Sequence, residues 1–117
     1  MTYAQGSIVI ADNPFAPGFR PFLVVSNSSR PYQGQEYTTA IITTTERDTA
    51  VRFEADELTE GGINDYPSFV NPWSLHMLQH EEVDRRVAQV SPDVTRAVAD
   101  GVARYIELNE EASEGEI

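Results

Sequence analysis

The amino-acid sequence predicts a mainly β fold, a small barrel or strongly bent sheet closed by one C-terminal helix. Short runs rich in β-branched residues recur through residues 7–90, clusters of Gly, Pro, Asn and Asp separate them, and a helical pattern follows only at the end. Short strands divided by turn signals are typical of barrels and bent sheets. The chain shows no internal repeat, linker or low-complexity block. We therefore expect a single domain over residues 1–110 and a short acidic tail over residues 111–117.

The first half of the chain contains the three strongest strand candidates. Residues Ser7–Ala11 form a β-rich run, and the Pro- and Gly-containing residues 12–20 are expected to form a loop. The continuous apolar stretch within Pro21–Asn27 predicts a strand that is buried on both faces. After a turn-forming connection over Ser28–Gln35, the segment Tyr37–Thr44 is dense in β-branched residues and predicts a third strand.

The second half is expected to return to the same sheet. Residues Ala50–Ala55 alternate between apolar and charged side chains, which indicates a strand with one solvated face. Gly and Asn-Asp pairs within residues 61–65 predict a long loop. Two apolar segments, Ser68–Val70 and Trp73–Leu78, are expected to rejoin the core, and a short strand is expected at Arg85–Val90.

The clearest helix lies at the end of the chain. Ser91 can cap its N-terminus, Pro92 suits its first turn, and Asp93 complements the positive end of the helix dipole. Apolar residues then fall on one face at helical spacing, namely Val94, Val98, Val102, Tyr105 and Ile106. Gly101 lies within this run and lowers helix propensity by about 1 kcal/mol relative to Ala, so packing must hold the helix at this point.

The charge balance is the most unusual property of the composition. The 117 residues carry 19 acidic and 8 basic side chains, which gives a net charge of −11 at pH 7, and every basic residue is Arg. Hydrated carboxylates keep proteins soluble in molar salt, so we expect a halophilic source such as a haloarchaeon. Nonspecific affinity for nucleic acids comes mainly from neutralised phosphates. Any RNA binding would therefore have to depend on a local Arg site, base stacking and groove shape.

Several classes of protein are disfavoured by the composition. The chain has no Cys, which excludes disulfides, thiolate catalysis and Cys-ligated zinc. Its apolar runs are too short to cross a bilayer, and its first residues lack the charged and apolar regions of a signal peptide. We therefore expect a cytoplasmic protein without a membrane partner.

One segment carries a specific family resemblance. Residues 20–27 read Arg-Pro-Phe-Leu-Val-Val-Ser-Asn, which resembles the Arg-Pro-x-Leu-Val-x-Ser/Gln-Asn signature of the MazF/PemK toxins. Gly6–Ile10 resembles the opening strand of that family, and Thr39–Thr44 resembles a strand that ends in a Thr at the active site. The second half and the final helix match more loosely, so that the resemblance covers residues 6–108.

The resemblance implies both a fold and an activity. The fold would be a small SH3-like β-barrel of the MazF/PemK/CcdB toxin type, usually a homodimer. The activity would be that of a metal-independent, cofactor-free endoribonuclease, the toxin of a type II toxin–antitoxin system, which cleaves single-stranded RNA at a short sequence. The substrate's own 2′-hydroxyl would be the nucleophile, and a 2′,3′-cyclic phosphate would remain. A cognate antitoxin would cover the RNA groove with an extended tail.

The resemblance also assigns the catalytic residues. Arg20 would stabilise charge at phosphorus, because its forked donors match two phosphate oxygens. Thr43 or Thr44 would hydrogen-bond the scissile phosphate or an attacking oxygen, and the alignment of Ala40–Ile42 favours Thr43 without excluding Thr44. A Thr is too weakly acidic to serve as a base without help, so this role is one of positioning.

Four more residues are candidates for substrate contact. Pro21, Asn27 and Ser68 match family positions, and Phe19 is the best placed aromatic side chain for stacking on a base, ahead of Tyr32. Trp73 is expected in the core or in a dimer interface.

The two His residues are not expected to take part in the chemistry. His76 and His80 have the i,i+4 spacing of a helical metal pair, but their segment is not clearly helical and no third ligand is evident. We expect them to be surface or partly packed side chains.

The first loop departs from the family pattern. Many members have a longer loop with a Gly-Ser-Glu-Gln stretch, whereas here Asp12–Phe19 contains no carboxylate beyond Asp12. Asp12 and Glu46 are candidates for the missing base. The shorter loop and the negative charge also support an alternative, a weakened or inactive PemK-like module that acts through protein contacts. DNA binding ranks last and is expected only of a toxin–antitoxin complex, because the final helix lacks a basic recognition face.

Overall fold

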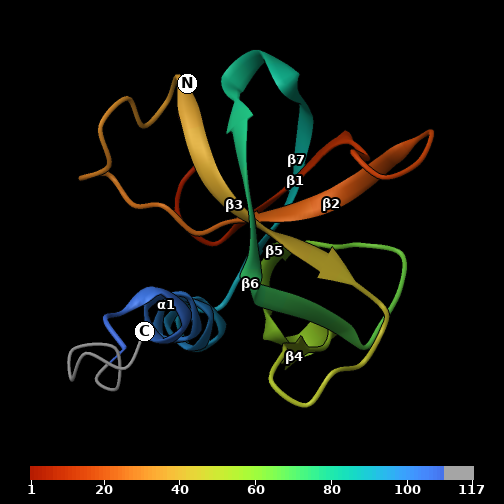
Figure 1. Ribbon diagram of the computed structural model, residues 1–117. Coiled ribbons are helices and arrows are strands. Elements are labelled where there is room, and N and C mark those ends of the chain that lie inside the picture. The colour runs from red at the N-terminus through yellow and green to blue at the C-terminus, as the bar shows by residue number, and fades with distance from the viewer. Residues whose placement is uncertain (110–117) are drawn as a thin grey trace.

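The computed structural model describes residues 1–109, so the predicted acidic tail lies outside the described residues. Within this range the elements in chain order are β1 (Ser7–Asp12), β2 (Phe19–Val24), β3 (Glu36–Thr43), β4 (Val51–Phe53), a 3₁₀ turn (Ala55–Glu57), β5 (Leu58–Gly61), β6 (Ser68–Gln79), a second 3₁₀ turn (His80–Glu82), β7 (Val83–Val90) and α1 (Pro92–Ile106). The strands form one curled antiparallel sheet in the order β4-β6-β3-β2-β1-β7-β5. Helix α1 packs beside the half-barrel, on β6 and β4 (Figure 1).

The predicted fold class is confirmed. Strands β1, β3, β4 and β7 lie within two residues of their expected bounds, and α1 begins where the capping pattern placed it. Ser91 is its N-cap, and its Oγ accepts a hydrogen bond from the Val94 N–H at 3.3 Å. The alternation predicted for β4 is also present, since Arg52 is exposed and Phe53 is buried.

Strand β2 lies at the centre of the sheet, and its residues Phe22–Val24 are buried on both faces, as the apolar run predicts. Leu23 belongs to a core that includes Val94 and Val98 of α1. Phe22 and Val24 belong to a second core on the opposite face, which also contains Tyr37. The bounds of β2 are shifted, however, because the strand begins at Phe19 and ends at Val24. Arg20 therefore lies in a strand and not in the predicted loop.

Two features of the second half were not predicted. Residues Leu58–Gly61 form the edge strand β5, which pairs with β7 and includes Gly61 of the expected loop. The two apolar segments expected after the loop form one long strand, β6, with a bulge opposite Ala40 and Ile41. Pro72 lies in this bulge, where its missing N–H interrupts no pairing with β3.

The bulge in β6 is also where α1 packs. A Cβ atom added to Gly101 would lie 2.8 Å and 2.9 Å from two ring carbons of Pro72. Gly101 therefore permits a close approach between helix and sheet, which explains a glycine in the middle of the helix. Packing at this point replaces the helix propensity that Gly lacks.

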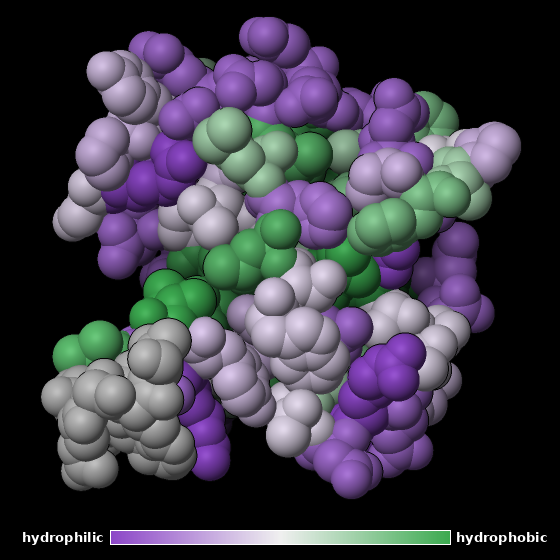
Figure 2. Space-filling model, in the orientation of Figure 1, coloured by the Kyte–Doolittle hydropathy of each residue, from purple (hydrophilic) through white to green (hydrophobic). Residues whose placement is uncertain are grey.

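The last turn of α1 is exposed, contrary to the predicted apolar face. Val94 and Val98 are buried, whereas Tyr105 is 42% and Ile106 71% exposed. The rings of Tyr105 and Trp73 form a T-shaped pair with 6.0 Å between their centroids. Trp73 is itself 40% exposed, so it does not lie in the core. Figure 2 shows a band of apolar surface crossing an otherwise largely hydrophilic face above α1.

Within the described residues, no helix is both long and apolar enough to span a bilayer.

Candidate functional site

The site begins where β2 and β3 separate. These strands pair only over Phe22–Val24, with Phe22 opposite Ile41. The Val25 N–H donates to the Thr38 carbonyl at 2.9 Å, so alternate β3 carbonyls, including that of Ile42, point toward β2. Ile42 faces Pro21 in this register, and Pro21 has no N–H to offer. The ladder therefore stops at the Arg-Pro pair.

Arg20 supplies the donor that Pro21 lacks. Its Nη2 donates to the Ile42 carbonyl oxygen at 2.8 Å, which fixes the guanidinium at the opening between the two strands. Continuing the strand register places Arg20 opposite Thr43 and on the same face of the sheet. The ring of Phe15 lies beneath the guanidinium, with 5.8 Å between Arg20 Cζ and the ring centroid.

The electrostatics of Arg20 suit an anion. Arg20 forms no ion pair with any carboxylate in residues 1–109, and its Nε is buried without a hydrogen-bond partner there. Desolvation by burial lowers the pKa of the guanidinium below its ordinary value, because burial disfavours the charged form. An Arg remains protonated in proteins in spite of such a shift. The side chain is thus a partly desolvated positive charge with unused donors.

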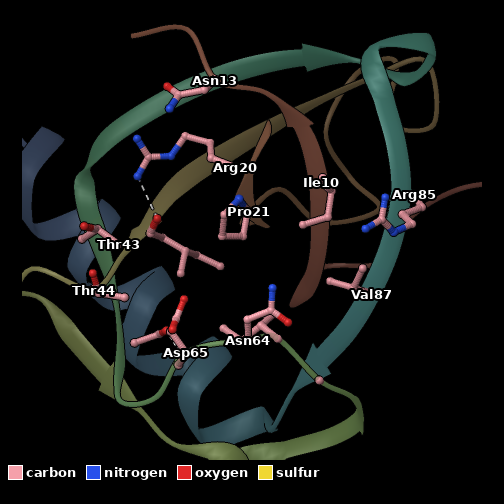
Figure 3. Close-up of a pocket in the computed structure, with 14 residues that line it drawn as sticks. Ile10, Asn13, Arg20, Pro21, Thr43, Thr44, Asn64, Asp65, Arg85 and Val87 are labelled. Carbon is pink, nitrogen blue, oxygen red and sulfur yellow. Dashed lines mark hydrogen bonds between the residues drawn. The ribbon is translucent and has the colours of Figure 1, made fainter. Parts of the chain in front are cut away.

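A cavity of about 510 Å³ opens beside Arg20 (Figure 3). Thr43 and Thr44 at the end of β3 form one wall, and Asn64 and Asp65 form another. Arg85 lies on the far side and pairs with Asp84. The rest of the lining comes from residues of the sheet and of the loops that follow β1 and β5. These residues are Ile10, Asn13, Pro21, Ile42, Gly62, Ile63, Ser68 and Val87.

The wall formed by residues 62–67 is held by local hydrogen bonds. The buried Ser68 hydroxyl donates to the Asp65 carbonyl oxygen at 2.7 Å, and the Ile63 N–H donates to the Tyr66 hydroxyl at 3.0 Å. Gly61 sets the start of this loop with a positive φ of 69°, in close contact with the backbone of Val87. The loop of residues 62–67 is therefore held in place by its own hydrogen bonds and by the sheet at both of its ends.

The structure brings five of the seven predicted site residues together. Arg20, Pro21, Thr43, Thr44 and Ser68 all line the cavity. The Thr43 hydroxyl also accepts a hydrogen bond from the Thr45 N–H at 3.1 Å. The Ser68 hydroxyl is committed to Asp65, so its contribution is to hold the loop.

The other two predicted residues lie elsewhere. Phe19 is next to Arg20 in a strand, so its side chain points to the opposite face, where it lines a separate hollow with Asp12. Asn27 lies beyond the other end of β2, is exposed, and accepts a hydrogen bond from the Ser29 N–H at 2.9 Å. Of the two candidate bases, Asp12 and Glu46, neither lines the Arg20 cavity.

Sequence reasoning missed Asn64, Asp65 and Arg85. Asn64 and Asp65 looked like ordinary turn residues, and only the pairing of β5 with β7 carries their loop to Arg20. Arg85 was one charge in an alternating strand, and nothing in its local pattern marks the face on which it lies. The pairing of distant segments was the missing information in both cases.

The two His residues are partly packed, as expected. His76 meets the edges of Phe15 and Phe22, and His80 Nδ1 lies 2.7 Å from the hydroxyl of buried Tyr37. Neither lines the Arg20 cavity. Within residues 1–109, no group of three or more potential His, Cys, Asp or Glu ligands is arranged to hold a metal ion.

Solved structures with the same architecture define the class of protein. An endoribonuclease in complex with its cognate antitoxin from a Mycobacterial species has a TM-score of 0.71 and 19% identity, with 92% of this chain and 96% of that chain covered. The Mycobacterium tuberculosis toxin MazF-mt6 has a TM-score of 0.68 and 25% identity, with 88% and 98% covered. MazE-MazF from Deinococcus radiodurans (Form-III) has a TM-score of 0.72 and 16% identity, with 93% and 100% covered. The curled sheet with its single helix is therefore the fold of MazF toxins.

The family itself is shown by the sequence match. Residues 4–106 match the family described as the PemK-like, MazF-like toxin of type II toxin-antitoxin systems. The chain belongs to this family. No curated protein sequence matches it significantly.

Proposed function

We propose that this protein is a metal-independent endoribonuclease that cleaves single-stranded RNA at a short sequence, as the toxin of a type II toxin–antitoxin pair in the cytoplasm. The observation that carries the proposal is Arg20, a partly buried guanidinium that has no counter-ion within residues 1–109 and is fixed beside Thr43 and Thr44 in a cavity. The volume of about 510 Å³ falls within the range of sites that hold a small ligand, roughly 300–1,000 Å³.

Arg20 would act on the phosphate. Its unused N–H groups can donate to the non-bridging oxygens of a scissile phosphate and tighten as negative charge develops on them in the transition state. Thr43, or Thr44 beside it, would hydrogen-bond the same phosphate or the attacking 2′-oxygen. The 2′-oxygen then forms its bond to phosphorus as the bond to the 5′-oxygen breaks, which leaves a 2′,3′-cyclic phosphate.

Because the protein is strongly acidic, it would bind RNA through this local site and not through its overall charge. Two guanidinium groups, those of Arg20 and Arg85, line the cavity of a protein with a net charge of −11. Such a site favours a single strand whose bases can be splayed into a hollow, over a duplex bound through a long row of phosphates. We expect a cognate antitoxin to occupy the same cavity, and we expect the toxin to form a homodimer.

The test is RNA cleavage in the presence of EDTA by the wild type, Arg20→Ala and Arg96→Ala. Arg96 is an exposed Arg on α1, outside the Arg20 cavity, and serves as a matched control for the loss of one positive charge. Reactions in molar KCl and in low salt would be mapped by primer extension. The wild type and Arg96→Ala should cut at one recurrent motif, and Arg20→Ala should be slower by about 10²-fold or more. Cleavage by Arg20→Ala at the wild-type rate would refute the assigned mechanism.

The alternative function is an inactive binding module. It is supported by the short first loop, in which residues 13–18 close on themselves through the Asn13 N–H to Gly18 carbonyl bond of 2.8 Å. No carboxylate in this loop is available to Arg20. Absence of any cut by folded wild-type protein, together with a stable complex with an antitoxin-like peptide, would favour this alternative.

A further inference from the structure

Asp65 is the only acidic residue among those that line the Arg20 cavity. It is exposed, and its carboxylate oxygens have neither a hydrogen bond nor an ion pair within residues 1–109. The cavity contains no His, Tyr, Cys or Lys side chain. Among the side chains that line this cavity, the Asp65 carboxylate is therefore the one of a type that commonly serves as a general base.

The position of Asp65 is set by its backbone. The Ser68 hydroxyl holds the Asp65 carbonyl at 2.7 Å, and the buried Ser68 begins strand β6. The backbone that carries the Asp65 carboxylate is thus tied to the first residue of β6. A catalytic group needs such fixed support, because small misplacements cost large factors in rate.

The charged groups that face Asp65 across the cavity come from strands β2 and β7. Arg20 reaches into the cavity from β2, and Arg85 lies on its β7 side (Figure 3). Thr43 and Thr44 stand between Arg20 and Asp65 at the end of β3. A phosphate held by Arg20 and its ribose would therefore lie in the same cavity as the Asp65 side chain.

We infer that Asp65 is the general base of the reaction, an inference that rests on the proposed ribonuclease function. The proton of the ribose 2′-hydroxyl passes to an Asp65 carboxylate oxygen while the 2′-oxygen bonds to phosphorus. The bond from phosphorus to the 5′-oxygen breaks, and the departing oxygen takes a proton from water. Arg20 carries the charge of the transition state, and Asp65 accepts the proton. Asp65 would thus take the place of the carboxylate that the short first loop lacks.

The experiment compares Asp65→Asn, Asp65→Glu and the control Asp56→Asn. Asp56 is an exposed Asp in the 3₁₀ turn after β4 and lies outside the cavity. For each folded variant, kcat, KM and the cleavage motif would be measured on one RNA that the wild type cuts. The pH dependence of kcat/KM would be recorded in the same buffers.

Asp65→Asn should lower kcat by about 10²- to 10⁴-fold with little change in KM or in the motif, because a positioned base contributes a factor of this order. Asp65→Glu should recover part of the rate, and Asp56→Asn should match the wild type. The fall in wild-type rate toward acid pH should be absent from the residual activity of Asp65→Asn.

Two results would overturn the assignment of Asp65. An unchanged kcat with an altered cleavage motif would make Asp65 a base-reading residue, and unchanged kcat and motif would remove it from the site. Both results leave the proposed function standing if Arg20→Ala is inactive. Failure of the wild type itself to cut would instead refute the proposed function.

Discussion

Gly61 offers a direct test of how the cavity wall is built. This glycine ends β5, pairs with Ala88 of β7, and has a φ of 69°. A Cβ atom at this position would lie 2.0 Å from the Val87 carbonyl oxygen and 2.9 Å from the Ala88 Cα atom. We expect Gly61→Ala to separate β5 from β7 and to destabilise the protein, because both contacts are with backbone that cannot rotate away.

The magnitude has two sources. A left-handed conformation costs a residue with a Cβ about 1–2 kcal/mol, and overpacking typically costs about 1–3 kcal/mol. Together they give a loss of about 2–5 kcal/mol in the free energy of unfolding, out of about 5–15 kcal/mol for a typical domain. At about 4 °C per kcal/mol for a chain of this size, the melting temperature should fall by about 8–20 °C.

The matched control is the next residue along the chain. Gly62 does not have a positive φ, and a Cβ there would meet only the Tyr66 hydroxyl, at an ordinary 3.5 Å. Thermal and urea unfolding would be followed by circular dichroism for the wild type, Gly61→Ala and Gly62→Ala at one protein concentration. Gly62→Ala should stay within about 1 kcal/mol of the wild type. Equal midpoints for the two variants would refute the close approach of β5 to β7.

Two further predictions concern the candidate site and the second core. Thr43→Val should lower the RNA cleavage rate by about tenfold or more, and Thr44→Val should lower it less, because Thr43 is opposite Arg20 on one face of the sheet whereas Thr44 follows the strand end. The reverse order in primer-extension assays would assign the role to Thr44. Tyr37→Phe should lower the free energy of unfolding by about 1–3 kcal/mol, since the buried Tyr37 hydroxyl lies 2.7 Å from His80 Nδ1 and accepts from the Tyr3 N–H at 3.2 Å. Urea denaturation beside the exposed control Tyr32→Phe would check this, and equal loss in both variants would contradict it.

The sequence predicts the elements whose pattern reflects their own burial. Strand β2 is buried on both faces, so its run of apolar residues marked it without knowledge of its neighbours. Helix α1 was equally clear at its start, because Ser91 and Pro92 act within a single turn. Its end was misjudged, since periodicity predicts a face but does not say how far the sheet extends beneath it. Tyr105 and Ile106 continue the stripe beyond the buried part of the helix.

What the sequence did not predict depends on pairing between distant segments. Strand β5 contains one apolar residue, Leu58, and exists because it extends the sheet beside β7. The same pairing brings Asp65 to the cavity wall that faces Arg20, so the sequence did not predict a carboxylate at this site. Arg20 and the two Thr residues were found only through the family signature, because an Arg before a Pro is by itself more often an exposed side chain.

The bond from Arg20 to the Ile42 carbonyl has a consequence for control of the protein. The guanidinium is oriented by the chain's own backbone, with no activating ligand or loop closure needed to place it. On the proposed function, we expect an inhibitor of this site to act by occupying it, and we expect its removal to restore cleavage activity.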